Sequence, residues 1–375
     1  MRSRSREPLV VHGNEFLARG EPLSGIAPPA VPSVDTDLLS GFTFACRPGC
    51  GLCCFTSPRL VGDDEARLRS LAPAARVLSD GRERRVAARA DGGACQFLRD
   101  LRCEVHRARP APCREFPITV HIGLRLQASL VLSCPGLGLD SLASYGSGRP
   151  LPPGSGLEEE LGSVLRRLSP QVERSRRESE RRHRRVVRLL VHEGRWVSEE
   201  DVRERLRAST LAPSDAEFAP TEPPSPEDGL ELLPMFYDAR SGPVALATAL
   251  GGWNTLELAP EGGAVTAGVI VPPDRRPRLE PIAERLLEGY LHYFLERDCF
   301  LAAVHLEVAR RPAGDVLDAA RADLHAIGSD VIARGAIRAK LLGTDGARLS
   351  GADIERGIRA TDQDWLDRPT WGERL

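Results

Sequence analysis

Eight of the nine cysteines in this chain of 375 residues lie between Cys46 and Cys134. This clustering constrains the fold more than any other feature of the sequence. We expect a reducing compartment, where a disulfide framework is not favoured. Clustered cysteines in such a protein usually bind metal or take part in catalysis. The sequence therefore predicts that this stretch folds around a metal.

The cysteines fall into a tight group and a spread group, namely Cys46, Cys50, Cys53 and Cys54, followed by Cys95, Cys103, Cys113 and Cys134. Thiolates are soft ligands that suit zinc, iron–sulfur clusters or copper(I). Gly49 and Gly51 flank Cys50 and let the backbone curl around a metal. Eight thiols are enough for two sites of four ligands each, or for one metal cluster together with structural or redox thiols. The spacing does not show which cysteines share a site.

Composition and hydropathy exclude several classes of protein. The chain is 41% apolar with a net charge of −2, which permits real cores and does not suggest a nucleic-acid or membrane-surface binder. The basic start is followed only by Leu9-Val10-Val11, too short for a signal peptide. The longest uncharged stretch, 241–256, is too short and too polar to span a bilayer. We therefore expect a cytoplasmic protein.

The predicted fold class is α+β, with a small metal-organised, cysteine-rich N-terminal domain followed by a mainly helical C-terminal region that holds a small sheet at 243–271. Proline- and glycine-rich stretches divide the chain. The expected units are a flexible arm at 1–40, the cysteine-cluster domain at 41–140, a linker at 141–156, a helical segment at 157–211, a proline-rich linker at 212–228 and the C-terminal domain at 229–375.

Hydrophobic periodicity places several elements. Alternation of apolar residues over 118–132 predicts a hairpin that turns near Gly123. An acidic start at 63–65 predicts a short helix. Further on, we expect strands at 244–250, 255–258 and 264–271, an amphipathic helix over 282–295, and helices through Lys340 and over 351–360.

The ordered cysteine motifs resemble a known family. They read Cys50-Gly-Leu-Cys53-Cys54, Cys95-Gln-Phe-Leu98, Cys103-Glu-Val-His-Arg-Ala-Arg109-Pro110-Ala-Pro-Cys113-Arg114-Glu-Phe116-Pro117 and Cys134-Pro135-Gly136. This order resembles the YkgJ-type cysteine-cluster family, a zinc- or iron-chelating domain found also in flagellin lysine N-methylases. The resemblance covers about a quarter of the chain, from Phe44 to Gly138.

The resemblance implies metal binding. Its methylase members imply an iron–sulfur cluster and the use of S-adenosylmethionine to methylate lysines of a protein substrate. Two non-enzymatic alternatives stay open: a structural-zinc module that acts through partners, and an iron or zinc carrier. Whether the protein is an enzyme, and its oligomeric state, do not follow from the sequence.

The family motif contains Arg109 and Arg114, each near a cysteine, as candidate cofactor-binding residues. A cation there offsets thiolate charge or holds an anionic substrate, and a surface salt bridge is the structural alternative. His106 stands where the family usually has tyrosine, and is either an extra ligand or a hydrogen-bonded structural histidine. Cys299, in an apolar helical run, is expected in the core.

Two further features favour plain structural roles. Gly136-Leu-Gly138 and Gly251-Gly252 are each only a short fragment of the glycine pattern found in nucleotide-binding loops. We therefore expect ordinary turns at both places. The arginine-rich stretch 166–188 suits a solvated helix with i,i+4 ion pairs better than a site for an anionic partner.

Overall fold

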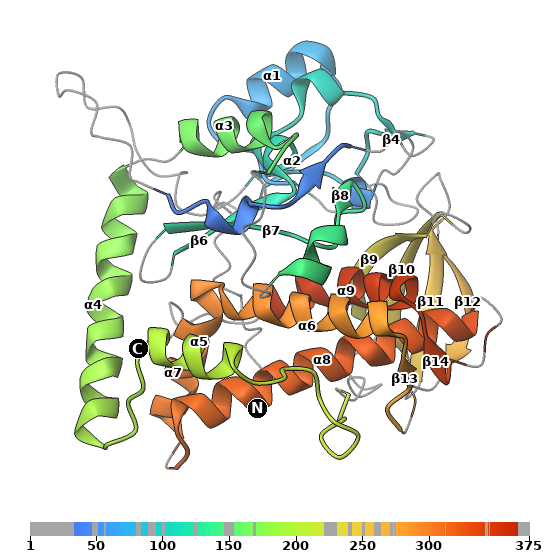
Figure 1. Cartoon of the computed structure of the whole chain (residues 1–375). Helices are drawn as coiled ribbons and strands as arrows, with labels where there is room; N and C mark the ends of the chain where they lie inside the picture. Colours follow the sequence, from blue (N-terminus) through green and yellow to red (C-terminus); the bar gives the residue numbers. More distant parts are fainter. Residues whose placement is uncertain are drawn as a thin grey trace, which may run out of the picture.

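The computed structural model confirms an α+β fold in which helices dominate the C-terminal half and short strands the N-terminal half (Figure 1). The structure describes residues 34–46, 52–55, 58–79, 84–88, 95–99, 102–122, 126–145, 154–167, 170–220, 231–238, 242–249, 252–258, 264–270, 273, 275–311, 313–341, 344 and 346–366. None of the helices in these ranges combines the length and apolar character needed to cross a bilayer.

The cysteine-rich half consists of short elements joined by loops. They are η1 (Asp37–Leu39), β1 (Thr43–Phe44), η2 (Leu52–Phe55), α1 (Asp64–Leu71), β2 (Val77–Ser79), β3 (Arg84–Val86), β4 (Leu98–Arg99), β5 (Arg102–Cys103), η3 (His106–Ala108), α2 (Ala111–Glu115), β6 (Ile118–Ile122), β7 (Leu126–Leu130), β8 (Leu137–Gly138) and η4 (Asp140–Ser144). Antiparallel pairing joins β2 to β3, β4 to β5, β6 to β7, and β1 to β8. The predicted short helix is confirmed as α1.

The predicted hairpin is confirmed as β6–β7, with Ile118 opposite Leu130 and Val120 opposite Ala128. Its turn, expected near Gly123, lies outside the described residues. All five residues of β7 are buried. The hairpin is therefore covered on both faces.

Three helices follow, as predicted for 157–211: α3 (Glu158–Arg167), α4 (Pro170–His192) and α5 (Glu199–Arg207). In α4, Arg182 pairs with Glu178 and Arg184 with Glu180 at 2.7 Å, which confirms the expected i,i+4 pairing on its outer face. The same helix also has a buried face, formed by Ser179, His183, Val186 and Leu190. Helix α4 is therefore amphipathic, and its buried face packs on α7.

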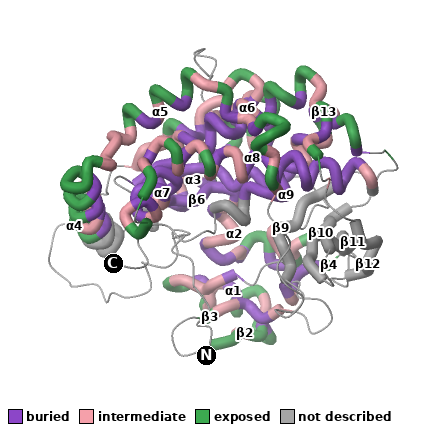
Figure 2. Tube along the Cα trace, turned by 90° about the horizontal axis from the view of Figure 1, so that it is seen from below, coloured by how far each residue is buried: buried purple, intermediate pink, exposed green. Residues whose placement is uncertain are grey.

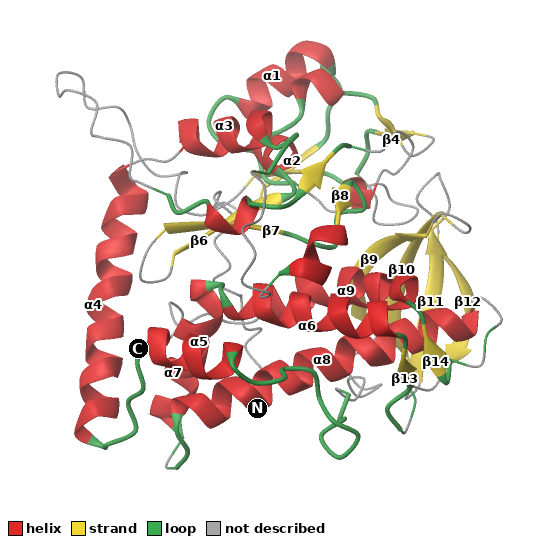
Figure 3. Ribbon diagram, viewed as in Figure 1, coloured by secondary structure: helices red, strands yellow, loops and turns green. Residues whose placement is uncertain are grey.

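The small predicted sheet is confirmed as an antiparallel meander, seen in Figure 3 beside the C-terminal helices. Its strands, in order of pairing, are β9 (Glu231–Asp238), β10 (Gly242–Ala249), β11 (Gly252–Leu258) and β12 (Ala264–Ile270). The sequence predicted the last three strands and missed β9.

The C-terminal helices are α6 (Pro281–Leu295), α7 (Asp298–Arg310), α8 (Val316–Leu341) and α9 (Gly351–Leu366), with a parallel pair of β13 (Arg278–Leu279) and β14 (Arg348–Leu349). Helices α8 and α9 approach closely at Gly335, where a Cβ would meet the Asp353 carbonyl oxygen at 2.8 Å. Long buried stretches of both helices are visible in Figure 2.

One large hydrophobic core runs from Leu38 to Ile358 and includes the β6–β7 hairpin together with helices from α3 to α9. A second, smaller core lies among the cysteines and is built around Leu68, Val86, Phe97 and Val105. The two halves of the chain therefore meet across the hairpin.

The ends of two predicted linking segments take part in this packing. Of the expected arm, residues 1–33 lie outside the described part, whereas Leu38 and Leu39 are buried in the large core. Of the expected linker at 141–156, residues 146–153 lie outside it, and Ser155 bridges to Thr43 of β1. The described parts of both segments are thus held by the fold.

Candidate metal centre

Short segments far apart in sequence carry the clustered thiols into one region. Cys46 follows β1, Cys53 and Cys54 lie in η2, Cys103 lies in β5, and Cys113 lies in α2. Cys95 joins them through its backbone N–H, which donates to the Cys54 carbonyl at 2.6 Å. Cys50 lies outside the described residues.

A chain of thiol hydrogen bonds connects three of these cysteines. The Cys54 thiol hydrogen-bonds to Cys53 and to Cys103. These bonds lower the pKa of Cys53 and lower the pKa of Cys103 to about 7, while they raise the pKa of Cys54, which keeps its proton. Cys103 therefore has thiolate character near neutral pH, and the thiolate is the form that binds metal.

The remaining thiols of the group are held in their neutral form by burial. Loss of hydration raises the pKa of Cys46 and Cys113, and raises that of Cys95 to about 11. Neighbouring thiols add to the effect, because Cys53 and Cys103 each disfavour a second negative charge at Cys95 and Cys113. A metal cation removes this penalty, since it replaces the protons and balances the thiolate charges.

Arg109 is a basic residue whose charge acts on several thiols of this group. Its guanidinium lowers the pKa of four thiols, those of Cys46, Cys53, Cys103 and Cys113. Glu160 of α3, a residue that the sequence did not single out, lies close enough to affect Cys46 and is itself influenced by Arg109. Helix α3, which packs on α2, therefore contributes to the electrostatics of the thiol group from outside the cysteine-rich segment.

Arg114 has a different environment. Its guanidinium donates to the Arg109 carbonyl at 2.6 Å and lies 3.6 Å from the carboxylate of Asp64. Asp64 is buried, and also accepts hydrogen bonds from the backbone N–H groups of Val61 at 3.0 Å and Ala111 at 2.9 Å. The expected acidic helix start thus ties α1 to the beginning of α2, the helix that carries Cys113.

Cys134 is held from the C-terminal half. It is buried in the large core, and its carbonyl accepts a hydrogen bond from the guanidinium of Arg359 on α9. Arg359 also donates to the carbonyls of Leu132 at 3.1 Å and Leu137 at 2.8 Å. No local pattern in the sequence could have indicated this support.

The segment after Cys134 brings it toward Cys46. The Ala45 N–H donates to the Gly136 carbonyl at 3.0 Å, and β8 pairs with β1. A Cβ at position 136 would stand 2.7 Å from the Ala45 carbonyl oxygen, so only glycine allows this approach. Gly136 lies in a turn, as predicted, whereas Gly138 lies in strand β8 instead of a turn. Gly251 lies outside the described residues.

The other two residues singled out in the sequence lie apart from the thiol hydrogen bonds. His106 is exposed on η3, and its pKa is lowered by partial burial and by Arg109. Cys299 is buried in α7, within the apolar environment that the sequence predicted.

The donor set fits a thiophilic metal. Six thiols influence one another electrostatically, and one cation offsets their charge. Within the described ranges, no three of these sulfur atoms all lie within 4.8 Å of one another. Metal binding therefore requires the loops to close further, or a ligand such as Cys50 from outside those ranges.

Comparison with known families agrees with this chemistry. Residues 45–133 match the family model CxxCxxCC, described as "Putative zinc- or iron-chelating domain". No curated protein and no solved structure matches the chain significantly. The matched segment contains all the clustered cysteines except Cys134, which follows it directly. The N-terminal cysteine-rich region of this chain is thus identified with the zinc- or iron-chelating cysteine-cluster domains, in agreement with the order of its motifs.

Proposed function

We propose that this protein binds a zinc ion or an iron–sulfur cluster through the thiols of its N-terminal region. The observation that carries the proposal is the electrostatic coupling of six thiols, brought together from separate segments beside Arg109. Cys50 and Cys134 complete the set of eight candidate ligands. Arg109 offsets the negative charge of the loaded site.

The metal also contributes to folding. Among the described residues, the small core beneath the thiols has six buried hydrophobic residues, one of which is Cys95, and the strands around it have two or three residues each. Such short elements bury little apolar surface, so a metal that joins them supplies folding free energy directly. Removing a ligand is therefore expected to loosen the region as well as to release metal.

Anaerobic purification of the full chain, followed by analysis of zinc, iron and acid-labile sulfide, tests the proposal. We expect wild-type protein to hold metal, and Cys53→Ser and Cys113→Ser to bind it at least about tenfold more weakly. Cys299→Ser is the matched control, because Cys299 is buried in a helix away from the thiol group. If the Cys53→Ser and Cys113→Ser proteins keep full metal content, the proposal is wrong.

The same measurement selects among the finer alternatives. Iron with matching sulfide would favour a redox-sensitive cluster, whereas stoichiometric, air-stable zinc would favour a structural site that supports binding of a partner. An exchangeable, substoichiometric metal would favour a carrier. Because free clustered thiols require reducing conditions, we place the protein in the cytoplasm.

The methylase extension rests on the resemblance of the cysteine motifs. In that reading the protein uses S-adenosylmethionine to methylate lysines of a protein substrate, and Arg109 and Arg114 are candidate cofactor contacts. Calorimetric titration of S-adenosylmethionine into metal-loaded protein tests it. Absence of binding would remove the methylase reading and leave the metal-binding proposal intact.

A further inference from the structure

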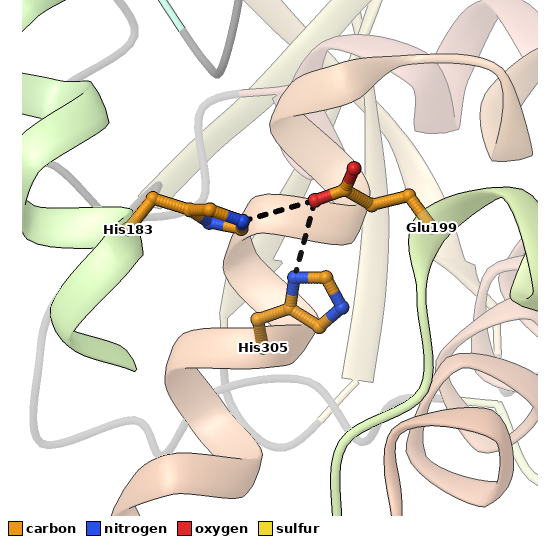
Figure 4. A group of neighbouring side chains, drawn as sticks. All are labelled: His183, Glu199 and His305. Carbon is orange, nitrogen blue, oxygen red and sulfur yellow. Dashed lines mark ion pairs between the residues drawn. The ribbon is translucent and has the colours of Figure 1, made fainter. Parts of the chain in front are cut away.

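Three side chains from separate helices point toward one another at a distance from the cysteines. His183 comes from the inner face of α4, Glu199 from the first turn of α5, and His305 from α7 (Figure 4). The Glu199 Oε1 atom lies 3.0 Å from His183 Nε2 and 3.7 Å from His305 Nδ1. One ligand atom from each residue lies within 4.8 Å of the other two.

The buried ring of His305 lacks well-formed hydrogen bonds. Its side chain is fully buried, at 0% exposure, and among the described residues neither ring nitrogen makes a hydrogen bond of normal geometry, although the Val197 backbone lies near enough to influence its pKa. The separation of 3.7 Å from Glu199 is too long for a hydrogen bond. A buried polar group without a well-formed hydrogen bond destabilises the fold, so such groups call for an explanation.

The surroundings of His305 and Glu199 favour the protonation states in which these side chains bind metal. Burial lowers the pKa of His305 to about 4, so the imidazole is neutral at physiological pH. Burial alone would raise the pKa of Glu199, but the hydrogen bond with His183 and the charge of Arg203 act in the opposite direction, and the net shift is downward. A neutral imidazole and an ionised carboxylate are the forms that bind metal.

The surrounding structure holds the three side chains in place. Helix α4 ends at His192, and Gly194 in the following turn has a φ of 68°, a left-handed conformation that favours glycine. The chain then crosses to α7. There Arg195 donates to the carbonyls of Val308 at 2.9 Å and Arg311 at 2.8 Å, at the end of α7. The next residue, Trp196, packs on His305 with ring centroids 4.7 Å apart. The ligand positions are thus fixed by the fold.

We propose that His183, Glu199 and His305 form a second metal site, separate from the cysteine cluster, for a borderline divalent ion such as Zn²⁺. Bonds of 2.0–2.1 Å in a tetrahedral zinc site place neighbouring ligand atoms about 3.3–3.4 Å apart. The two observed separations, 3.0 and 3.7 Å, bracket that spacing. Two imidazoles and a carboxylate suit Zn²⁺ or Fe²⁺, whereas Mg²⁺ and Ca²⁺ prefer oxygen ligands alone.

Three protein ligands leave one coordination position for water or an exogenous ligand. The side chain of Glu199 keeps 23% of its surface exposed, while those of the two histidines are buried. The Oε1 atom of Glu199, which faces the two histidines, is itself buried, so the exposed part of this side chain lies away from the ligand atoms.

Metal content of the full chain tests the site. The zinc content of wild-type protein from zinc-supplemented cells is compared with that of the variants Glu199→Gln and His183→Gln. His192→Ala is the control, because His192 is exposed on the same helix as His183. We expect the first two variants to bind the ion at least about tenfold more weakly. The control should match wild type. Equal zinc content in all four folded proteins would overturn the proposal.

Cobalt substitution separates this site from the thiols. In Co²⁺-loaded protein, Glu199→Gln should remove the visible d–d absorption of a nitrogen and oxygen site and leave any thiolate-to-cobalt charge-transfer band. Cys53→Ser should weaken the charge-transfer band and leave the d–d absorption of the nitrogen and oxygen site. If the variants fail to fold, zinc-edge X-ray absorption of wild type decides, because zinc bound by sulfur alone contradicts the site. A wild-type protein that shows the nitrogen and oxygen site but no thiolate-to-cobalt band would count against the cysteine proposal only.

Discussion

Asp362, near the end of α9, accepts hydrogen bonds from both terminal nitrogens of Arg297, at 2.8 and 3.2 Å, and both residues are fully buried. The pair also binds the N-terminal half of the protein. Arg297 donates to the carbonyl of Leu130 at 2.8 Å, and Asp362 accepts from the N–H of Leu132 at 2.7 Å. This ion pair therefore joins the β6–β7 hairpin to the helices.

Breaking the ion pair should be strongly destabilising. Asp362→Asn leaves the buried charge of Arg297 uncompensated, which typically lowers the free energy of unfolding by about 3–5 kcal/mol. Urea denaturation followed by circular dichroism measures the loss. Glu307→Gln, which removes an exposed i,i+4 pair with Arg311, should change stability by less than about 1 kcal/mol. Similar losses in both variants would contradict the assignment.

Arg359→Gln should loosen the segment that contains Cys134. The substitution removes charged hydrogen bonds to the carbonyls of Leu132, Cys134 and Leu137, each worth about 1.5–3 kcal/mol before compensation. Hydrogen exchange should become faster across residues 132–138. Arg348→Gln, at an exposed arginine on β14, is the control. Unchanged exchange in this segment would show that the guanidinium is dispensable.

Asp64→Ala should weaken metal retention without removing any candidate ligand. It deletes the carboxylate that holds Ala111 at the start of α2, and a lost charge-assisted hydrogen bond costs about 1.5–3 kcal/mol. We expect a lower metal content and a lower unfolding temperature. The neighbouring Asp63→Ala is a close control, because Asp63 is exposed and its side chain makes no capping hydrogen bond. Equal behaviour of the two variants would rule out this role.

Gly289→Ala should destabilise the contact between α6 and η4. A Cβ at position 289 would overlap the carbonyl oxygen of Leu142, and backbone atoms cannot move aside as a flexible side chain can. Overpacking of this kind costs about 1–3 kcal/mol or more. Thermal denaturation checks the effect against Arg285→Ala, an exposed position of the same helix. A Gly289→Ala protein as stable as this control would mean that the two elements can separate freely.

His292 should make the fold sensitive to acid. Burial lowers its pKa, with a further contribution from Arg207, and outweighs the opposite effects of Glu288 and Glu296. The unfolded chain therefore takes up this proton first, so stability falls as the pH drops below about 6.5, by at most about 1.4 kcal/mol per pH unit. In His292→Gln the loss between pH 7 and pH 5 should be smaller than in wild type. An identical pH dependence would exclude His292 as a source.

Local patterns in the sequence predicted many elements but not how the hairpin is covered. Alternating polar residues in β6 and β7 ordinarily indicate a face exposed to water. Here His121 bonds to Ser129 at 2.9 Å, and Gln127 bonds to the backbone of Glu296 and Asp298. His121 and Ser129 satisfy each other within the hairpin, whereas Gln127 is satisfied by groups of the C-terminal helices, and such partners cannot be read from a period of two.

The candidate sites were also only partly predictable from local sequence patterns. The clustered thiols could be singled out from the sequence because their residue type and order suggest metal chemistry. Asp64 and Glu160 could not, since an acidic helix start is usually a helix-dipole feature. His183, Glu199 and His305 come from three different helices, so no short motif contains them. Only packing of α4 and α5 on α7 brings them together.

In this protein, the segment that matches the family model is shorter than the segment that packs into one continuous core. The segment shared with other proteins is residues 45–133, yet its strand β7 is covered by helices that begin far beyond that segment. Cut out alone, the shared segment would expose Leu126, Leu130 and Leu132 to water. The unit that evolution has reused is therefore smaller than the unit that can fold, and a cysteine-cluster module of this protein has to be expressed with its helices.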